Sequence, residues 1–131
     1  MEFHHIGVAC NNLEETKNWV KRSFPICEEQ GPIFDQLQNA SFITLKMKDG
    51  FLIELISGGQ VATFLKKGIN LYHVCYEVED LENTIENLKK NGAIVISKPK
   101  PAVLLNNRRI AFLNTPLGII ELLERKSGDG K

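Results

Sequence analysis

The chain has 131 residues, enough for one domain with a sizeable core, and its 16 basic residues balance 16 acidic ones. A hydrophobic content of 43% and a charged content of 24% fit a globular protein, and the balanced charge argues against nucleic acid or an anionic membrane as a partner. With no signal pattern, no apolar run near the ~20 residues that span a bilayer, and three scattered cysteines, we expect a cytoplasmic protein with reduced thiols.

The first half of the chain predicts a strand, a helix and three more strands. A strand over 3–10 is followed by Asn12 and, three residues later, Glu15, a pattern typical of a helix N-cap. The helix is expected to end before Pro25, because the residue preceding a proline avoids helical geometry. Further strands are expected at 26–30, 38–48 and 51–57, with a loop opening at Gly31 and Pro32.

The second half predicts the same order of elements. After a short helical segment near 64–65, we expect a strand over 71–78 and a helix capped by Asp80 that ends at Asn91 and Gly92. The remaining strands are expected at 93–97, 109–113 and 118–123, with a proline-containing loop over 99–107 and a frayed tail over 127–131.

The two halves also repeat in sequence. The stretch Phe-His-His-Ile-Gly-Val at 3–8 returns as Leu-Tyr-His-Val-Cys-Tyr at 71–76, an offset of 68 residues. Ile-Glu-Leu at 53–55 returns at 120–122, an offset of 67 residues. The sequence therefore predicts an α+β fold in a single domain over 1–131, with two tandem βαβββ modules at about 1–60 and 69–126 whose mixed sheet forms a cup.

Four polar residues repeat in register inside apolar strands, namely His5, Glu54, His73 and Glu121. Two imidazoles and two carboxylates suit a divalent metal such as Zn, Ni, Co, Mn or Fe(II). A carboxylate within an apolar strand also faces the cost of burying charge without a partner. Ordinary core or surface roles for these residues would not explain their repetition, so we expect one divalent ion per four-residue set.

Other polar residues are given structural roles. His4 is expected to pack on the helix side of its strand, and Glu77 and Glu124 are expected to be solvated near strand ends. Arg108 and Arg109 either bind a substrate anion or lie in a solvated loop, and the solvated loop is favoured.

Motifs over most of the chain resemble the vicinal oxygen chelate superfamily. They are His-His-Ile-Gly-Val-Ala at 4–9, Phe-Leu-Ile-Glu-Leu-Ile at 51–56, Tyr-His-Val-Cys-Tyr-Glu-Val at 72–78 and Thr-Pro-Leu-Gly-Ile-Ile-Glu-Leu-Leu-Glu at 115–124. The superfamily includes glyoxalase I, methylmalonyl-CoA epimerase, extradiol dioxygenases, fosfomycin resistance enzymes and bleomycin resistance proteins. The resemblance implies their fold, but one fold hosts many chemistries.

The resemblance also implies a ligand set and a type of reaction. The four repeated residues match the His/Glu/His/Glu metal ligands of bacterial glyoxalase I, whereas the epimerase has glutamine or glutamate at the position of Glu54 and shares the other three. Both families move a proton next to a carbonyl through a metal-held enolate, and the position matching Glu121 takes part in that transfer. A fourth protein ligand argues against a dioxygenase.

We therefore expect a divalent-metal-dependent isomerase, epimerase or lyase similar to methylmalonyl-CoA epimerase, acting on an acyl thioester or another carbonyl compound. Glyoxalase I (lactoylglutathione lyase) and sequestration of a small molecule, as in bleomycin resistance proteins, are the alternatives. The epimerase's second catalytic glutamate falls at Leu37 here, which leaves Asp35 as the candidate for that role. Glyoxalase I also uses arginines near its first strand, where this chain has Val8 and Ala9. Open sheet edges and the resemblance together predict a homodimer.

Overall fold

The computed structural model describes residues 1–126, and in it the chain forms two compact units. One unit is His5–Tyr72, and the other joins Met1–His4 to the described residues from His73 onward. The tail expected at 127–131 lies outside the described residues. No helix in residues 1–126 is both long enough and apolar enough to cross a membrane.

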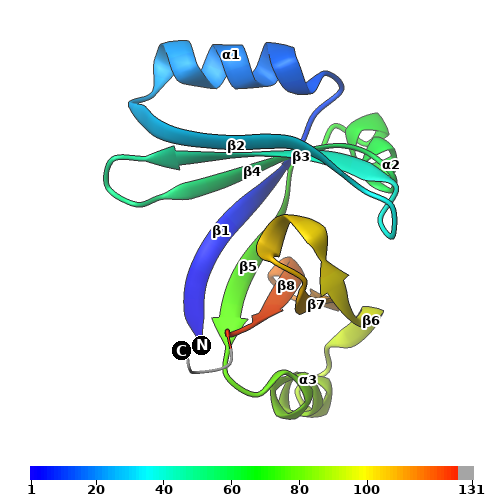
Figure 1. The fold of residues 1–131 in the computed structure, drawn as a ribbon. Coiled ribbons are helices and arrows are strands. Elements are labelled where there is room, and N and C mark those ends of the chain that lie inside the picture. The colour runs from blue at the N-terminus through cyan, green and yellow to red at the C-terminus, as the bar shows by residue number, and fades with distance from the viewer. Residues whose placement is uncertain (127–131) are drawn as a thin grey trace. The chain divides into compact units, whose positions relative to one another are not determined.

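The unit His5–Tyr72 contains a four-stranded mixed sheet in the order β2-β3-β4-β1 (Figure 1). Strand β1 runs parallel to β4, and the other two pairings are antiparallel. Its elements are β1 (Glu2–Ala9), whose first residues belong to the other unit, α1 (Leu13–Ser23), β2 (Ile26–Asp35), β3 (Ala40–Met47), β4 (Leu52–Gly58) and α2 (Val61–Lys66).

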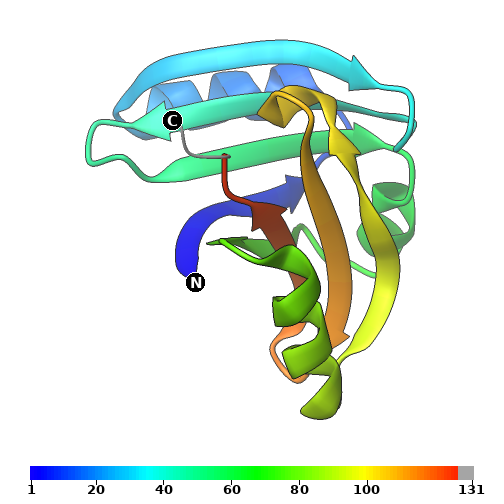
Figure 2. The same ribbon diagram turned by 60° about the horizontal axis from the view of Figure 1, so that its bottom comes forward.

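The second unit repeats this arrangement with strands in the order β6-β7-β8-β5. Strand β5 runs parallel to β8, and the pairs β6–β7 and β7–β8 are antiparallel, so β6 and β7 run side by side in Figure 2. Its elements are β5 (Leu71–Val78), α3 (Leu81–Lys90), β6 (Ile94–Ala102), a 3₁₀ turn (Val103–Leu105), β7 (Arg108–Thr115) and β8 (Gly118–Glu124).

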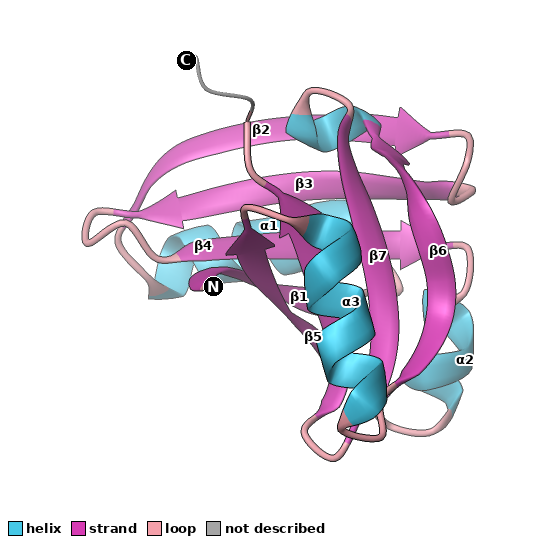
Figure 3. Cartoon of the chain, turned by 90° about the horizontal axis from the view of Figure 1, so that it is seen from below, coloured by secondary structure: helices cyan, strands magenta, loops and turns pink. Residues whose placement is uncertain are grey.

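Each sheet buries one face against its own long helix. Helix α1 covers the first sheet (Figure 1), and Val20 packs there among buried side chains of β3 and β4. Helix α3 covers the second sheet (Figure 3), and Leu81 and Ile85 pack against buried side chains of β7 and β8. We call the opposite face of each sheet its non-helical face.

The helix starts predicted from the sequence are confirmed. The Oδ1 atom of Asn12 accepts a hydrogen bond from the backbone N–H of Glu15 at 3.0 Å. The Oδ1 atom of Asp80 accepts one from the backbone N–H of Asn83, also at 3.0 Å. Each cap satisfies an N–H group that the helix itself leaves without an acceptor.

Two predicted loops are wrong, because strands β2 and β6 continue through prolines. In β2 a register shift between Gln30 and Ile33 accommodates the Gly31–Pro32 step. Gly31 has φ of +101°, and a Cβ there would lie 2.5 Å from the carbonyl oxygen of Phe42, so only glycine fits. A similar shift between Ser97 and Lys100 accommodates Pro99 in β6. Both strands are at a sheet edge, where bulges and prolines are tolerated.

Candidate metal-binding pairs

The first candidate pair lies in the unit His5–Tyr72. His5 is on β1 and Glu54 on the parallel strand β4, where Glu54 lies opposite Gly7. His5 is 1% exposed and Glu54 is 5% exposed. The Nε2 atom of His5 is 3.6 Å from Oε1 of Glu54, so the two side chains meet on the non-helical face.

The second candidate pair repeats this geometry in the other unit. His73 is on β5 and Glu121 on the parallel strand β8, where Glu121 lies opposite Cys75. Both side chains are buried, and Nε2 of His73 is 2.9 Å from Oε1 of Glu121. The four residues singled out from the sequence thus form two similar His–Glu pairs, one in each unit.

Each pair has the separation and chemistry of two donors that share a metal ion. Donor atoms about 2.0–2.2 Å from an ion lie roughly 2.8–3.6 Å from each other at octahedral or tetrahedral angles. The separations of 2.9 Å and 3.6 Å lie near the two ends of that range. The buried carboxylates of Glu54 and Glu121 also carry charge that a divalent cation would offset. The residues present therefore fit a divalent metal.

An aromatic side chain missed by the sequence reasoning flanks the second pair. The ring of Phe112, on β7, meets the imidazole of His73 edge to face, with centroids 5.4 Å apart and an interplanar angle of 77°. Phe112 is also the register partner of Glu121 on the neighbouring strand. A comparison of the two repeats could have singled out Phe112. At the same register in the first module, opposite Glu54, the residue is Thr44, so the modules differ at this position.

The carboxylate of Asp35 is buried at the end of β2 and accepts hydrogen bonds from the turn that follows. Its Oδ1 accepts hydrogen bonds from the backbone N–H groups of Leu37 at 2.9 Å and Gln38 at 3.4 Å. Its Oδ2 accepts one from the side-chain amide of Gln38 at 2.9 Å. Asp35 is 1% exposed, so it can take up a substrate proton only if the side chain of Gln38 moves away.

The expectation that Glu77 is solvated and Arg108 lies in a solvated loop is wrong. Nη1 of Arg108 donates to Oε2 of Glu77 at 2.6 Å, and the two side chains are 15% and 21% exposed. Burial raises the pKa of the Glu77 carboxyl. The hydrogen bond from Arg108 and the charges of Arg108, Arg125 and His4 outweigh burial, so the pKa lies below its ordinary 4.5.

Arg109 and Glu124 are also paired, contrary to expectation. Arg109 donates to both carboxylate oxygens of Glu124, at 3.0 and 2.6 Å, and to both of Glu82 on α3, at 2.7 and 3.1 Å. The hydrogen bond from Arg109 is the main cause that lowers the pKa of Glu124. This bridge ties α3 to β7 and β8, and the guanidinium is already engaged by two carboxylates.

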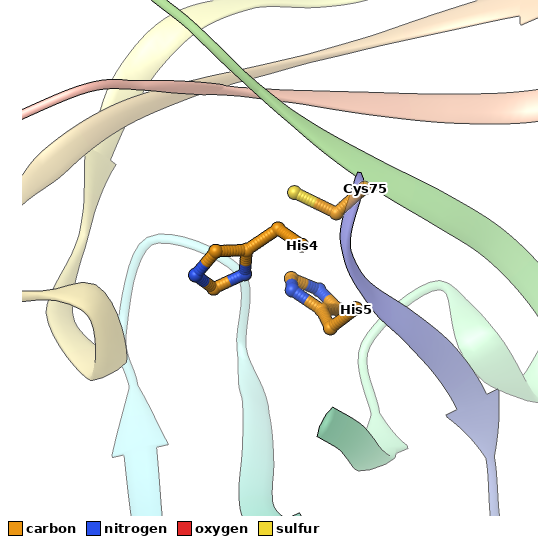
Figure 4. Close-up of side chains that lie close together, drawn as sticks. All are labelled: His4, His5 and Cys75. Carbon is orange, nitrogen blue, oxygen red and sulfur yellow. The ribbon is translucent and has the colours of Figure 1, made fainter. Parts of the chain in front are cut away.

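His4 is half-buried and lies near Cys75, as the sticks in Figure 4 show. A ring nitrogen of His4 is within 4.8 Å of the Sγ atom of Cys75. Cys75 is fully buried and packs with Ala102, Ile110 and Leu123, which agrees with its predicted role as a small apolar residue. His4 thus packs beside β5, in the unit that does not contain α1.

Comparisons with known proteins match most of the chain. Residues 4–112 match the family model of the glyoxalase/bleomycin resistance protein/dioxygenase superfamily. The chain is 36% identical over 117 residues to the ethylmalonyl-CoA/methylmalonyl-CoA epimerase of Cereibacter sphaeroides, covering 85% of this chain and 86% of the relative.

Two solved structures are similar in fold. The methylmalonyl-CoA epimerase of Mycobacterium tuberculosis has a TM-score of 0.77 at 20% identity and covers 98% of this chain and 91% of its own. The Streptomyces coelicolor methylmalonyl-CoA epimerase, in complex with 2-nitronate-propionyl-CoA, has a TM-score of 0.74 at 19% identity, covering 97% and 96%. These likenesses confirm the α+β fold class of tandem βαβββ modules.

Proposed function

The chain belongs to the glyoxalase/bleomycin resistance protein/dioxygenase superfamily, and on that premise we propose that it is an epimerase of a coenzyme A thioester, similar to methylmalonyl-CoA epimerase. The observation that carries the proposal is the 36% identity to the Cereibacter sphaeroides epimerase across 85% of this chain. The two buried His–Glu pairs support it, because their imidazole and carboxylate groups suit the divalent ion that we propose for the reaction.

We further propose that both pairs hold one divalent ion, Ni, Co, Zn or Mn, through His5, Glu54, His73 and Glu121. The two similar donor separations and the burial of both carboxylates support this ligand set. When bound, such an ion polarises a carbonyl oxygen and stabilises the negative charge that develops there. The protein's own residues then have to move the proton.

Glu121 is the proposed base. Its carboxylate accepts the proton from the carbon next to the thioester carbonyl, and the electrons of that C–H bond shift toward the carbonyl oxygen. His73, with Nε2 at 2.9 Å from Oε1 of Glu121, restricts the orientation of the carboxylate. Return of the proton to the same face regenerates the starting isomer.

Epimerisation requires a proton from the opposite face, and Asp35 is the proposed second acid–base residue. It takes up a proton from solvent, delivers that proton to the reacting carbon and is left as a carboxylate, while Glu121 returns its own proton to solvent. The hydrogen bonds of Asp35 to Leu37 and Gln38 mean that it must release Gln38 first. The variant Asp35→Asn is expected to keep solvent exchange while losing interconversion of the two isomers, which chiral chromatography of the product measures. Interconversion at the wild-type rate would assign the second proton transfer to another group.

Solvent deuterium incorporation tests the function as a whole. The metal-loaded protein is incubated in D₂O with methylmalonyl-CoA and, separately, with the glutathione hemithioacetal of methylglyoxal. The proposal predicts label in the thioester and no turnover of the hemithioacetal. Turnover of the hemithioacetal alone would favour glyoxalase I, whose His/Glu/His/Glu ligand set this chain matches. Tight binding of carbonyl compounds without exchange or turnover would favour sequestration.

The assembly state and the cellular location stay predictions. We expect a homodimer, because β2 and β6 are edge strands whose backbone groups invite pairing with another chain. Sedimentation at micromolar concentration is expected to show twice the chain mass of 14.8 kDa. A single species at the mass of one chain would refute the dimer. Fractionation of cells is expected to place the protein in the cytoplasm.

A further inference from the structure

We propose that Phe112 limits the space for the alkyl group on the reacting carbon, so that a smaller side chain at this position shifts the preference of the enzyme toward a 2-ethyl thioester relative to a 2-methyl thioester. This inference rests on the proposed epimerase function and adds a residue that determines its specificity. It follows from the place of Phe112 in the second sheet and from the residue at the same register in the first.

Phe112 lies beside both members of the second pair. It is directly opposite Glu121 in the antiparallel pairing of β7 and β8, and side chains at such positions have Cβ atoms about 4.5–5.5 Å apart. The edge-to-face contact with His73 places its ring on the non-helical face of the sheet. Any group that reaches the carboxylate of Glu121 from this face therefore approaches the Phe112 ring.

The ring is held in place, but not wholly covered. Phe112 packs at the border of the buried cluster formed by Cys75, Ala102, Ile110 and Leu123. The residue as a whole is only partly buried. Phe112 thus presents an apolar ring, here called the apolar wall, beside His73 and Glu121.

The first module has a smaller residue at the matching register. The residue at the same register, opposite Glu54, is Thr44, and the residue on the other side of Glu54 is Gly7. In the second module the corresponding neighbours of Glu121 are Phe112 and Cys75. Both modules therefore keep the His–Glu pair, but the two neighbours of Glu121 are larger than the two neighbours of Glu54.

The reaction brings the alkyl group to this wall. A carbon that gives its proton to Glu121 approaches the carboxylate to about hydrogen-bond distance, roughly 3 Å. The alkyl substituent is bonded to that same carbon, one bond farther out, within reach of the Phe112 ring. One added methylene against an apolar wall typically changes kcat/KM by about 10- to 200-fold.

The test compares two thioesters that differ by one methylene. We would measure kcat/KM for solvent deuterium exchange with methylmalonyl-CoA and ethylmalonyl-CoA for the wild type, Phe112→Leu and Phe112→Ala. The ratio of the two values is expected to shift toward ethylmalonyl-CoA by roughly 10-fold or more in Phe112→Ala, with a smaller shift in Phe112→Leu. Thr44→Val, at the same register in the other module, is the matched control and is expected to leave the ratio within about twofold.

A second readout separates specificity from support of His73. Co²⁺ affinity, measured by calorimetry, reports whether the variants disturb the metal ligand. An unchanged ratio in both Phe112 variants would overturn the inference, as would an equal loss with both thioesters accompanied by weaker Co²⁺ binding, which would reduce Phe112 to a support for His73. Absence of exchange by the wild type with either thioester would instead contradict the proposed function and this inference together.

Discussion

The two modules share a plan and differ in the residues around their His–Glu pairs. In each, a histidine near the start of one strand and a glutamate on the parallel neighbour meet on the non-helical face. The register positions that flank the pairs do not match. The first module has Gly7 beside its glutamate and Thr44 on the next strand, where the second has Cys75 and Phe112.

The modules also differ in charge at equivalent positions. The second module carries the pair Glu77–Arg108 at 2.6 Å. At the repeat offset of 68 residues the first module carries Ala9 and Ala40, both buried. The donor atoms are thus common to both modules, whereas the ion pair Glu77–Arg108 and the ring of Phe112 stand at positions where the first module has Ala9, Ala40 and Thr44. We infer that the second module is specialised for the proton transfer.

Removing one glutamate charge at a time tests whether Glu121 and Glu54 have different roles. Glu121→Gln is expected to lower the rate of deuterium exchange by about 100- to 10,000-fold, the usual contribution of a general base. Glu54→Gln is expected to lower it by less than about tenfold, because an amide oxygen still serves as a metal ligand. Mass spectrometry of the thioester measures both. Equal losses in the two variants would make the glutamates equivalent and contradict the specialisation.

The Glu77–Arg108 pair is expected to make the free energy of unfolding depend on pH. Replacement Glu77→Gln is expected to lower the free energy of unfolding by about 1–3 kcal/mol at pH 7, because it removes a partly buried, charge-assisted hydrogen bond. The pKa of Glu77 is lowered in the folded state, so its contribution is full above the ordinary value of 4.5 and is lost as the pH falls through the folded pKa.

Urea unfolding at a series of pH values measures this effect. The difference between wild type and Glu77→Gln is expected to be constant from pH 7 to pH 5 and to shrink below that. Ala9→Ser, at the repeat position in the first module, is the control, and its effect is expected to be independent of pH. A difference for Glu77→Gln that persists unchanged into acid would contradict the role of the ion pair.

The two modules are alike in their helix caps, so equivalent substitutions there are expected to have equal effects. Asn12→Ala and Asp80→Ala are each expected to lower the free energy of unfolding by about 1 kcal/mol, since each removes one acceptor for a helix N–H group. The same urea experiment applies. Costs that differ by more than about twofold would mean that the two helices are not equivalent in stability.

The sequence was sufficient for features that depend on local rules. Asn12 and Asp80 cap helices because their side chains accept from a backbone N–H three residues later. The periodic apolar strands also predicted which face of its strand each of the two histidines and two glutamates occupies, since alternation alone fixes the face. The repeat added what a single strand pattern lacks, which is the match between the two pairs.

The features that could not be predicted from the sequence depend on contacts between residues that are distant in the chain. The bulge at Gly31 is stabilised by its neighbour β3, so local composition indicated a loop where the strand continues. Arg108 and Glu77 are 31 residues apart, and only the pairing of strands brings them together. The sequence pattern did not distinguish Phe112 from other strand residues, because its contact with His73 depends on the order of strands in the sheet.

In the proposed metal site, the two His–Glu pairs act together on one ion. Metal analysis of the protein after loading with Co²⁺ and removal of excess tests it most directly, in the wild type, His5→Ala and His73→Ala. The account predicts one ion per chain in the wild type and nearly complete loss in both variants, with circular dichroism showing an intact fold. Two ions per chain in the wild type, falling to one in each variant, would show that the pairs bind metal separately and would contradict it.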